Sequence, residues 1–120
     1  RLVEFWRSNS GGLDIVVLKN EVWLTSLDPT IGREINKARP CVILSPDVLN
    51  KYSATVTVAP LTSTLKKYPT RIDCNVNGKK GQIVIDQIRS IDKSRLIKKI
   101  SSINEVTSEK VYKTIVAYFK

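Results

Sequence analysis

Three cations, Arg33, Lys37 and Arg39, lead into the apolar run 41–44 within the stretch DPTIGREINKARPCVILSPDV, residues 28–48. A guanidinium keeps its charge at physiological pH and can donate to two oxygens of a phosphate or a carboxylate at once. The 120-residue chain contains no histidine, the side chain that most readily moves protons near neutral pH. This segment therefore predicts anion binding, and any acid–base chemistry beside it must come from other groups.

The charge balance points to an anionic partner. The chain carries 20 Lys and Arg against 11 Asp and Glu, a formal net charge of +9 at pH 7, and 42% of its residues are hydrophobic. Such a chain is long enough for one cored domain and attracts a nucleic acid, an anionic membrane surface or an acidic protein. It has no apolar stretch near the roughly 20 residues of a membrane span and no apolar core of a secretory leader near its start. We therefore expect a cytoplasmic protein with no membrane partner.

The cysteines favour the same compartment. Cys41 and Cys74 are far apart in sequence and form no CxxC pair, so we expect two reduced thiols on strands. With no histidine and only these two cysteines, zinc would have to rely on carboxylates, which is uncommon for that ion. The sequence predicts no metal site and no cofactor.

The apolar pattern predicts a mostly β domain. Short runs rich in β-branched residues and bounded by Pro, Gly, Asn or Asp lie at 21–27, 41–45, 54–60, 70–76 and 81–86. Val and Thr alternate in the third run, as in a half-buried strand. The stretch before them ends in Ser, Asn and Gly, so we interpret residues 1–19 as an N-terminal extension or a cloning remnant and 20–120 as the domain.

The last part of the chain has a helical period. Val111, Ile115 and Phe119 recur at every fourth position, and Thr107 or Ser108 could cap the start of a C-terminal helix. We expect this stripe to pack on the core rather than to bind a partner, because a small barrel needs an element to cover its open edge or mouth.

Two lysine- and arginine-rich segments stand out after the central strands. One is LKKYPTR at 65–71, with the pair Lys79-Lys80 on the other side of the following strand, and the other is RSIDKSRLIKK at 89–99. Single lysines of this kind often serve as solvated edges that discourage edge-to-edge pairing of strands. Edge protection does not require the chain-wide excess of positive charge, which favours an anion-binding surface.

Three stretches in order resemble the signature blocks of the MazF/PemK toxin endoribonucleases. They are NEVWLTSLDPTIGREINKARPCVILSPD at 20–47, VTVAPLTS at 56–63 and DQIRSIDKSRLIKKI at 86–100. Each block alone is weak, whereas three in order in a basic chain of this size make a specific match that extends from residue 20 to the C-terminal helix.

The resemblance implies an SH3-like β-barrel with short helices and a C-terminal α-helix. It implies a homodimer that cuts single-stranded RNA, commonly mRNA, at a short sequence without a metal. It further implies a cognate antitoxin whose acidic, flexible tail occupies the RNA groove, a partner that suits the basic charge of this chain.

The resemblance also suggests the reactive residues. The family's catalytic arginine, in an Arg-Pro pair, corresponds to Arg39, and its catalytic threonine corresponds to Thr62. Pro40 keeps the backbone of Arg39 extended. From spacing alone, a turn residue whose hydroxyl binds its own backbone is the favoured interpretation of Thr62, and the resemblance reverses that preference.

For the general base the resemblance suggests Asp86, which could instead form a structural salt bridge with a neighbouring arginine. The chain departs from the PemK branch at two positions, with Arg33 in place of a histidine and Val84 in place of an arginine. Glu34 is the reserve base. The residues that we expect to bind RNA besides the catalytic ones are Arg33, Glu34, Lys37, Ser63, Lys66, Lys67, Gln87 and Arg89.

Two other functions remain open at this point. Gyrase-binding toxins of the CcdB type share the barrel and the dimer, but their function depends on a tryptophan near the extreme C-terminus. Trp6 and Trp23 lie far from the C-terminal residues VAYFK. A non-catalytic nucleic-acid-binding module would keep the basic segments and would need neither Arg39 nor Thr62.

Overall fold

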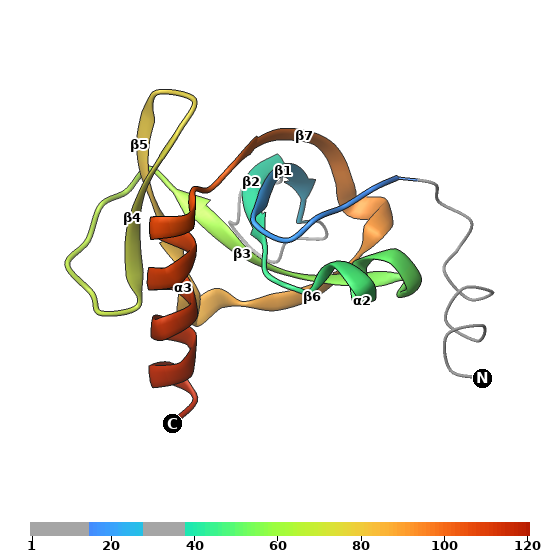
Figure 1. The fold of residues 1–120 in the computed structure, drawn as a ribbon. Helices are drawn as coiled ribbons and strands as arrows, with labels where there is room; N and C mark the ends of the chain where they lie inside the picture. The colour runs from blue at the N-terminus through green and yellow to red at the C-terminus, as the bar shows by residue number, and fades with distance from the viewer. Residues whose placement is uncertain (1–14, 28–37) are drawn as a thin grey trace, which may run out of the picture.

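The structure is a computed structural model that describes residues 15–27 and 38–120. Seven strands and two helices make up most of this part of the chain (Figure 1). The strands are β1 (Glu21–Ser26), β2 (Ala38–Ile43), β3 (Thr55–Thr62), β4 (Arg71–Val76), β5 (Lys79–Val84), β6 (Arg89–Asp92) and β7 (Leu96–Ser102). The helices are α2 (Asp47–Tyr52) and α3 (Glu105–Tyr118), with 3₁₀ turns η1 (Ile85–Gln87) and η2 (Lys93–Arg95).

The strands form one curled sheet in the order β4-β5-β3-β2-β1-β7, with β6 paired to β3, and every pairing is antiparallel. The register of β7 on β1 shifts twice, and such bulges increase the bend of a strand. Figure 1 shows the result, with β7 arching over β1 and β2. This half-barrel with a C-terminal helix confirms the predicted fold class.

Two apolar clusters lie on opposite faces of β2 and β3, because successive side chains of a strand point to opposite sides. Val42 and Leu61 belong to the first cluster, which α3 joins through Val111. Cys41 and Val58 belong to the second. The remaining members of the second cluster are Val17, Trp23, Ile43, Val56, Ile91 and Leu96. Both clusters use strands that the sequence predicted.

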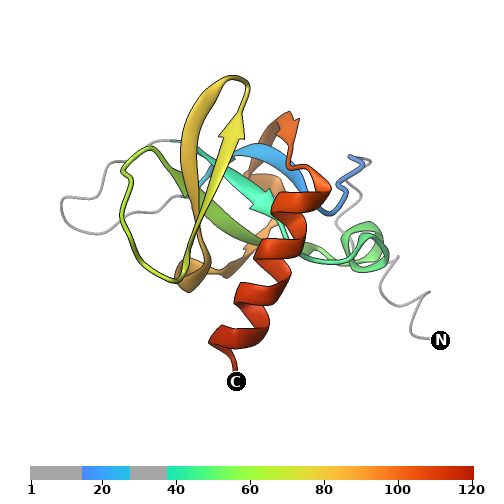
Figure 2. The same ribbon diagram turned by 60° about the vertical axis from the view of Figure 1, so that its left-hand side comes forward.

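The helix α3 begins earlier than expected. The prediction of Thr107 or Ser108 as the cap is wrong, because the Asn104 side chain accepts a hydrogen bond from the Thr107 amide at 2.8 Å and the helix starts at Glu105. Along the apolar stripe Val111 is buried and Ile115 packs against the first cluster, whereas Phe119 is 70% exposed. Core packing therefore covers only the first two members of the predicted stripe, since the helix extends past the sheet at its C-terminal end (Figure 2).

All five predicted strands are present, and the structure adds elements that the sequence analysis did not predict. The segment 89–99, interpreted as a basic cluster, is strands β6 and β7 joined by η2. The short helix α2 also lacked a prediction. Although segment 89–99 is rich in lysine and arginine, it buries Ile91 and Leu96 in the second cluster.

The hairpin of β4 and β5 stands beside α3 (Figures 1 and 2). Its turn is Asn77-Gly78, and both residues have positive φ, 52° and 82°, as a two-residue type I′ hairpin requires. The Asn77 side-chain amide donates to the carbonyl oxygen of Ile100 in β7 at 3.0 Å. This bond fixes the tip of the hairpin against the opposite end of the sheet.

Val17 lies on the extension side of the predicted boundary between residues 19 and 20, and it is buried in the second cluster.

In the two described ranges, 15–27 and 38–120, no helix has the length and apolar character needed to cross a membrane.

Candidate functional site

Arg39 and Thr62 lie at neighbouring strand ends. The antiparallel pairing of β2 and β3 joins Cys41 to Pro60. The ladder between the two strands ends at this pair, and Arg39 lies two residues before Cys41 while Thr62 lies two residues after Pro60, so both residues lie just beyond the same end of the ladder. The other neighbour of Arg39, on β1, is the buried Thr25. The two residues that the resemblance suggests as catalytic thus come together across adjacent strands.

The side chains of these residues share one face of the sheet with a second arginine. Arg39 alternates with Cys41 along β2, and Thr62 has the same parity as Val58, so both point to the side of the second apolar cluster. Arg89 of β6 pairs directly with Val58 and points to that side as well. We call the set Arg39, Thr62 and Arg89 the arginine face.

The electrostatics of Cys41 involve both arginines. Burial raises the pKa of the Cys41 thiol to about 11, and the charges of Arg89 and Arg39 both act in the opposite direction. Both guanidinium groups therefore act on the same buried thiol. No carboxylate in the part of the chain that the structure describes forms a salt bridge with either arginine. The arginine face therefore offers two exposed cations to a ligand anion.

The Thr62 hydroxyl has one intramolecular partner among the described residues. The Thr64 amide donates to Thr62 Oγ1 at 3.1 Å, which is the local turn contact considered from the sequence. This bond uses an acceptor lone pair and leaves the hydroxyl proton available for donation. On the neighbouring strand, a Cβ added to Gly81 would meet the Thr62 carbonyl oxygen at 3.0 Å. The close approach of β5 to β3 at Thr62 therefore favours glycine at position 81.

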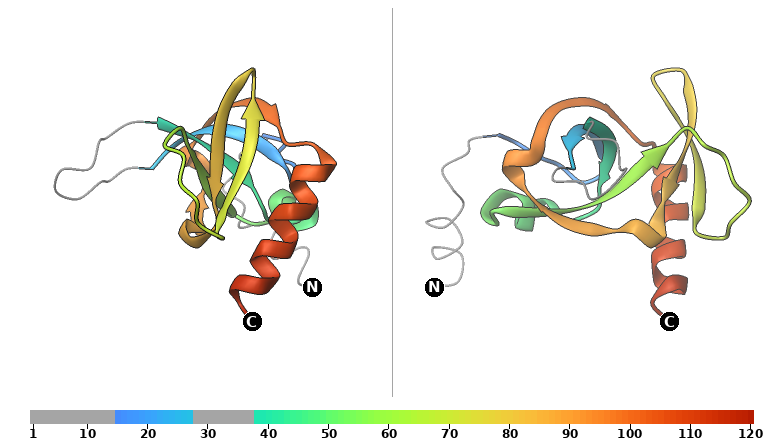
Figure 3. Two further views of the ribbon diagram at one scale, coloured as in Figure 1. Left: turned by 90° about the vertical axis from the view of Figure 1, so that its left-hand side faces the viewer. Right: turned by 180° about the vertical axis from the view of Figure 1, so that it is seen from behind.

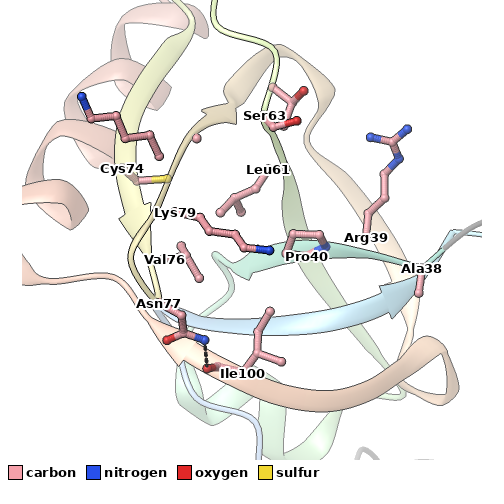
Figure 4. A pocket seen from close by; sticks show the side chains of 13 residues that line it. Ala38, Arg39, Pro40, Leu61, Ser63, Cys74, Val76, Asn77, Lys79 and Ile100 are labelled. Carbon is pink, nitrogen blue, oxygen red and sulfur yellow. Dashed lines mark hydrogen bonds between the residues drawn. The ribbon is translucent and has the colours of Figure 1, made fainter.

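A cavity of about 590 Å³ opens beside the same strand ends. In Figure 4 Arg39 and Ser63 stand on one side of it and Cys74 and Val76 on the other, and Lys79 reaches across toward Pro40. Its full lining is Ala38, Arg39, Pro40, Leu61, Thr62, Ser63, Cys74, Val76, Asn77, Lys79, Lys80, Gly81 and Ile100. The cavity thus has an apolar floor with cations and hydroxyls around it.

The hairpin contributes two site residues that the sequence analysis did not propose. Lys79 and Lys80 line the cavity with Arg39, although the sequence showed them only as a basic pair. The Asn77-Gly78 dipeptide was the available signal, because a two-residue turn brings the residues after it beside the preceding strand.

Asp86 and Gln87 lie apart from this cavity. Both are exposed in η1, between Gln82, which pairs with Thr62, and Arg89, which pairs with Val58. The structure therefore positions Asp86 along the same edge of β3, outside the cavity lining. Within residues 15–27 and 38–120, the alternative of a salt bridge from Asp86 to an arginine has no counterpart.

The remaining predicted residues fall into two groups. Lys66 and Lys67 are exposed in the connection between β3 and β4. Arg33, Glu34 and Lys37 lie outside the described residues.

The comparison with protein families gives a match over most of the chain. Residues 19–119 match the family described as PemK-like, MazF-like toxin of type II toxin-antitoxin system. The chain belongs to the PemK/MazF toxin family. Its membership agrees with the Arg-Pro pair and the threonine that the structure brings together at adjacent strand ends.

Individual relatives agree with the family. The endoribonuclease EndoA of Bacillus subtilis is 30% identical over 103 residues, covering 81% of this chain and 89% of that protein. An endoribonuclease MazF of Staphylococcus epidermidis is 35% identical over 96 residues, covering 75% and 80%. The fold is similar to the crystal structure of MazF from Deinococcus radiodurans, with a TM-score of 0.77, 24% identity and coverage of 88% of this chain and 98% of that one.

Proposed function

We propose that this PemK/MazF family member is a toxin endoribonuclease that cleaves single-stranded RNA, commonly mRNA, at a short sequence without a metal. The observation that carries the proposal is the arginine face, where Arg39, which has no carboxylate partner among the described residues, lines one cavity with the Thr62 hydroxyl, and Arg89 lies on the same side of the sheet for a neighbouring phosphate. A phosphodiester brings the negative charge that such a face lacks.

The reaction that suits these groups is an internal transesterification. The ribose 2′-oxygen attacks the adjacent phosphorus, a P–O bond forms, and the bond from phosphorus to the 5′-oxygen breaks. The products are a 2′,3′-cyclic phosphate and a free 5′-hydroxyl. Negative charge grows on the phosphoryl oxygens in the transition state, where Arg39 donates as a fixed cation and Thr62 as a neutral hydroxyl. Arg33 adds a second guanidinium to that charge.

Two protons must move in this reaction. We assign the proton of the 2′-hydroxyl to Asp86, with Glu34 as the reserve base, and the proton for the leaving 5′-oxygen to water or a guanidinium. Asp86 lies outside the cavity lining, on the edge of β3 that pairs with Gln82 and Arg89, so this role requires the RNA strand to extend from Arg39 and Thr62 along that edge.

The strand of RNA needs further contacts outside the reacting phosphate. We assign these to Lys37, Ser63, Lys66, Lys67, Gln87 and Arg89. An acidic antitoxin tail would compete for the same cations, so we propose a cognate antitoxin as the second partner and a homodimer in the cytoplasm as the acting form.

The test is cleavage of a long single-stranded RNA by the purified protein in EDTA. We expect discrete fragments from the wild type and cleavage at least about 10²-fold slower by Arg39→Ala at equal concentration. Binding of the RNA without any cleavage would replace this proposal with a non-catalytic nucleic-acid-binding module. Absence of both binding and cleavage would return the gyrase-binding alternative, which a supercoiling assay would then examine.

A further inference from the structure

The connection between β3 and β4, residues 63–70, is held by a side chain of another strand. The Gln82 side-chain oxygen accepts a hydrogen bond from the Lys66 amide at 2.9 Å, and the Gln82 side-chain nitrogen donates to the Lys66 carbonyl oxygen at 3.0 Å. The Gln82 side chain thus makes the two bonds that a neighbouring strand would make. The chain at Lys66 is therefore bound in both directions, as it would be in a β-ladder.

Two charged residues of β4 complete the hydrogen bonding of Gln82. Its nitrogen also donates to Asp73 Oδ1 at 2.8 Å, and its oxygen also accepts from Arg71 Nη1 at 3.3 Å. The same Arg71 nitrogen donates to the Thr64 carbonyl oxygen at 3.0 Å. Gln82 is 6% exposed, and these bonds use both its donors and both acceptor sites. Residues 63–70 thus have a defined course without a helix or strand of their own.

The location of Gln82 brings this connection to the arginine face. Gln82 is the register partner of Thr62 on β3, so its side chain and that of Thr62 point to the same side of the sheet. Figure 3 shows residues 63–70 looping out beside the β4–β5 hairpin. A nucleic-acid strand that crosses the arginine face therefore meets this loop next.

The exposed side chains of the loop have the chemistry that single-stranded RNA requires. Tyr68 is 53% exposed, with Lys66 Nζ at 5.6 Å and Arg71 Cζ at 5.7 Å from its ring centroid. Unpaired bases stack on such rings, and adjacent cations pair with the phosphates that flank the base. An acidic peptide would use the cations and leave the ring without a partner, so the combination favours RNA.

We propose that Gln82 is a positioning residue that holds residues 63–70 as a preformed RNA-binding arm, in which Tyr68 stacks on one unpaired base and Lys66 and Lys67 neutralise phosphates. The inference rests on the proposed function and adds to it the contact that takes a base. Because the arm is ordered before the RNA arrives, binding does not have to bear the conformational cost of ordering it.

Binding of a fluorescein-labelled single-stranded RNA pool, 2′-O-methylated throughout so that it cannot be cleaved, tests this assignment directly. We expect Tyr68→Leu to raise Kd about tenfold and Tyr68→Phe, which keeps the ring, to leave Kd within about twofold. Gln82→Leu should also raise Kd about tenfold and remove the protection of the Lys66 amide from hydrogen exchange, while the single-turnover maximal rate on cleavable RNA changes by less than about threefold.

Asn50 offers a matched control. It is also a buried amide that binds the backbone of a loop, through a bond to the Ser45 carbonyl oxygen at 2.8 Å, and it lies at α2, across the molecule from the connection between β3 and β4 (Figure 1). Asn50→Leu should lower the melting temperature as Gln82→Leu does and leave Kd unchanged. Equal effects of Asn50→Leu and Gln82→Leu on Kd would overturn the positioning role.

The other outcomes are equally decisive. Faster exchange at Lys66 in Gln82→Leu with an unchanged Kd would mean that the loop does not bind RNA. An equal rise of Kd in Tyr68→Leu and Tyr68→Phe would mean that the Tyr68 ring does not stack on a base. If the Tyr68 variants bind RNA as the wild type does but lose affinity for an acidic peptide, the arm is a protein-binding surface and the inference fails. If the wild type neither binds nor cleaves RNA, the proposed function fails first.

Discussion

A charged residue lies at each end of the β1–β2 pair, and the two residues differ in burial and in hydrogen-bond partners. At the start of β1, Glu21 is 7% exposed and its Oε1 accepts from the Leu18 amide at 2.8 Å and from Trp23 Nε1 at 3.0 Å, while Oε2 meets Lys99 Nζ at 3.1 Å. At the other end of the pair, near the start of β2, Arg39 is exposed and forms no salt bridge with any carboxylate that the structure describes.

The difference separates a charge that holds the fold from one that is free to bind a ligand. Burial alone would raise the pKa of Glu21, but the hydrogen bonds from Leu18, Trp23 and Lys99 and the charge of Lys99 together lower it. Each lone pair that this carboxylate uses ties β1 to its surroundings. Arg39 makes no comparable contact with residues 15–27 or 38–120, so toward this part of the chain its charge is available to a phosphate.

The largest effect that we expect is on catalysis at the Arg39 end. Arg39→Ala should lower single-turnover cleavage by about 10²-fold or more, the scale for loss of one donor at developing charge, with little change in thermal stability. Stopped-flow or quenched cleavage and a melting curve on the same sample measure both. Activity within a few-fold of the wild type would remove Arg39 from the mechanism.

The converse is expected at the Glu21 end. Glu21→Leu should lower the free energy of unfolding by about 3 kcal/mol, because the Leu18 amide, the Trp23 indole and the Lys99 ammonium lose their acceptor. Urea titration measures this loss. The folded fraction should cleave RNA at the wild-type rate, and a matching loss of activity per folded molecule would erase the contrast between the two ends.

Thr62 should show an intermediate effect on the reaction. Thr62→Ala should lower the cleavage rate about tenfold, since a neutral hydroxyl makes a weaker hydrogen bond than a guanidinium, and Thr62→Ser should retain most of the rate. If Thr62→Ala is instead insoluble while Thr62→Ser is normal, the bond from the Thr64 amide was the more important role of this hydroxyl.

The smallest effect concerns pH and stability. Because the pKa of Glu21 is lower in the folded state than in the unfolded state, its charged form stabilises the fold above the unfolded pKa, and this contribution is lost as the pH falls through the folded pKa. Glu21→Gln keeps an acceptor for Leu18 and Trp23 but has no such titration. The wild type should exceed Glu21→Gln in stability by about 1 kcal/mol at pH 7, and urea titrations should show the gap closing below about pH 4. A constant gap across that range would contradict the assignment to Glu21.

The sequence predicted five strands and suggested Arg39 and Thr62 as site residues, but it did not predict the residues that hold the site in place. Short runs rich in β-branched residues and bounded by turn residues were enough for five strands, whereas Arg39 and Thr62 were suggested by the family resemblance and not by any local pattern. Strands β6 and β7 were not predicted, because the lysines and arginines of segment 89–99 obscured the apolar pattern. Lys93 between them is 2% exposed, and this burial lowers its pKa, a packing result that no local pattern indicates.

The Gln82 contacts show the same limit. Its partners Asp73, Arg71 and Lys66 lie 9, 11 and 16 residues away in sequence. Nothing near Gln82 in the sequence distinguishes it from a solvated strand residue. Its role depends on the hairpin turn at Asn77-Gly78, which folds β5 back along β4 and brings these residues into one row.

The central claim is that the arginine face runs a metal-free transesterification, and the ends of the cleaved RNA test it most directly. Fragments produced in EDTA by the wild type, analysed by mass spectrometry, should carry a 2′,3′-cyclic phosphate on one side of the cut and a free 5′-hydroxyl on the other, and Arg39→Ala should yield them at least about 10²-fold more slowly. Fragments with a 5′-phosphate, or cyclic-phosphate fragments formed at the same rate by Arg39→Ala, would contradict the account.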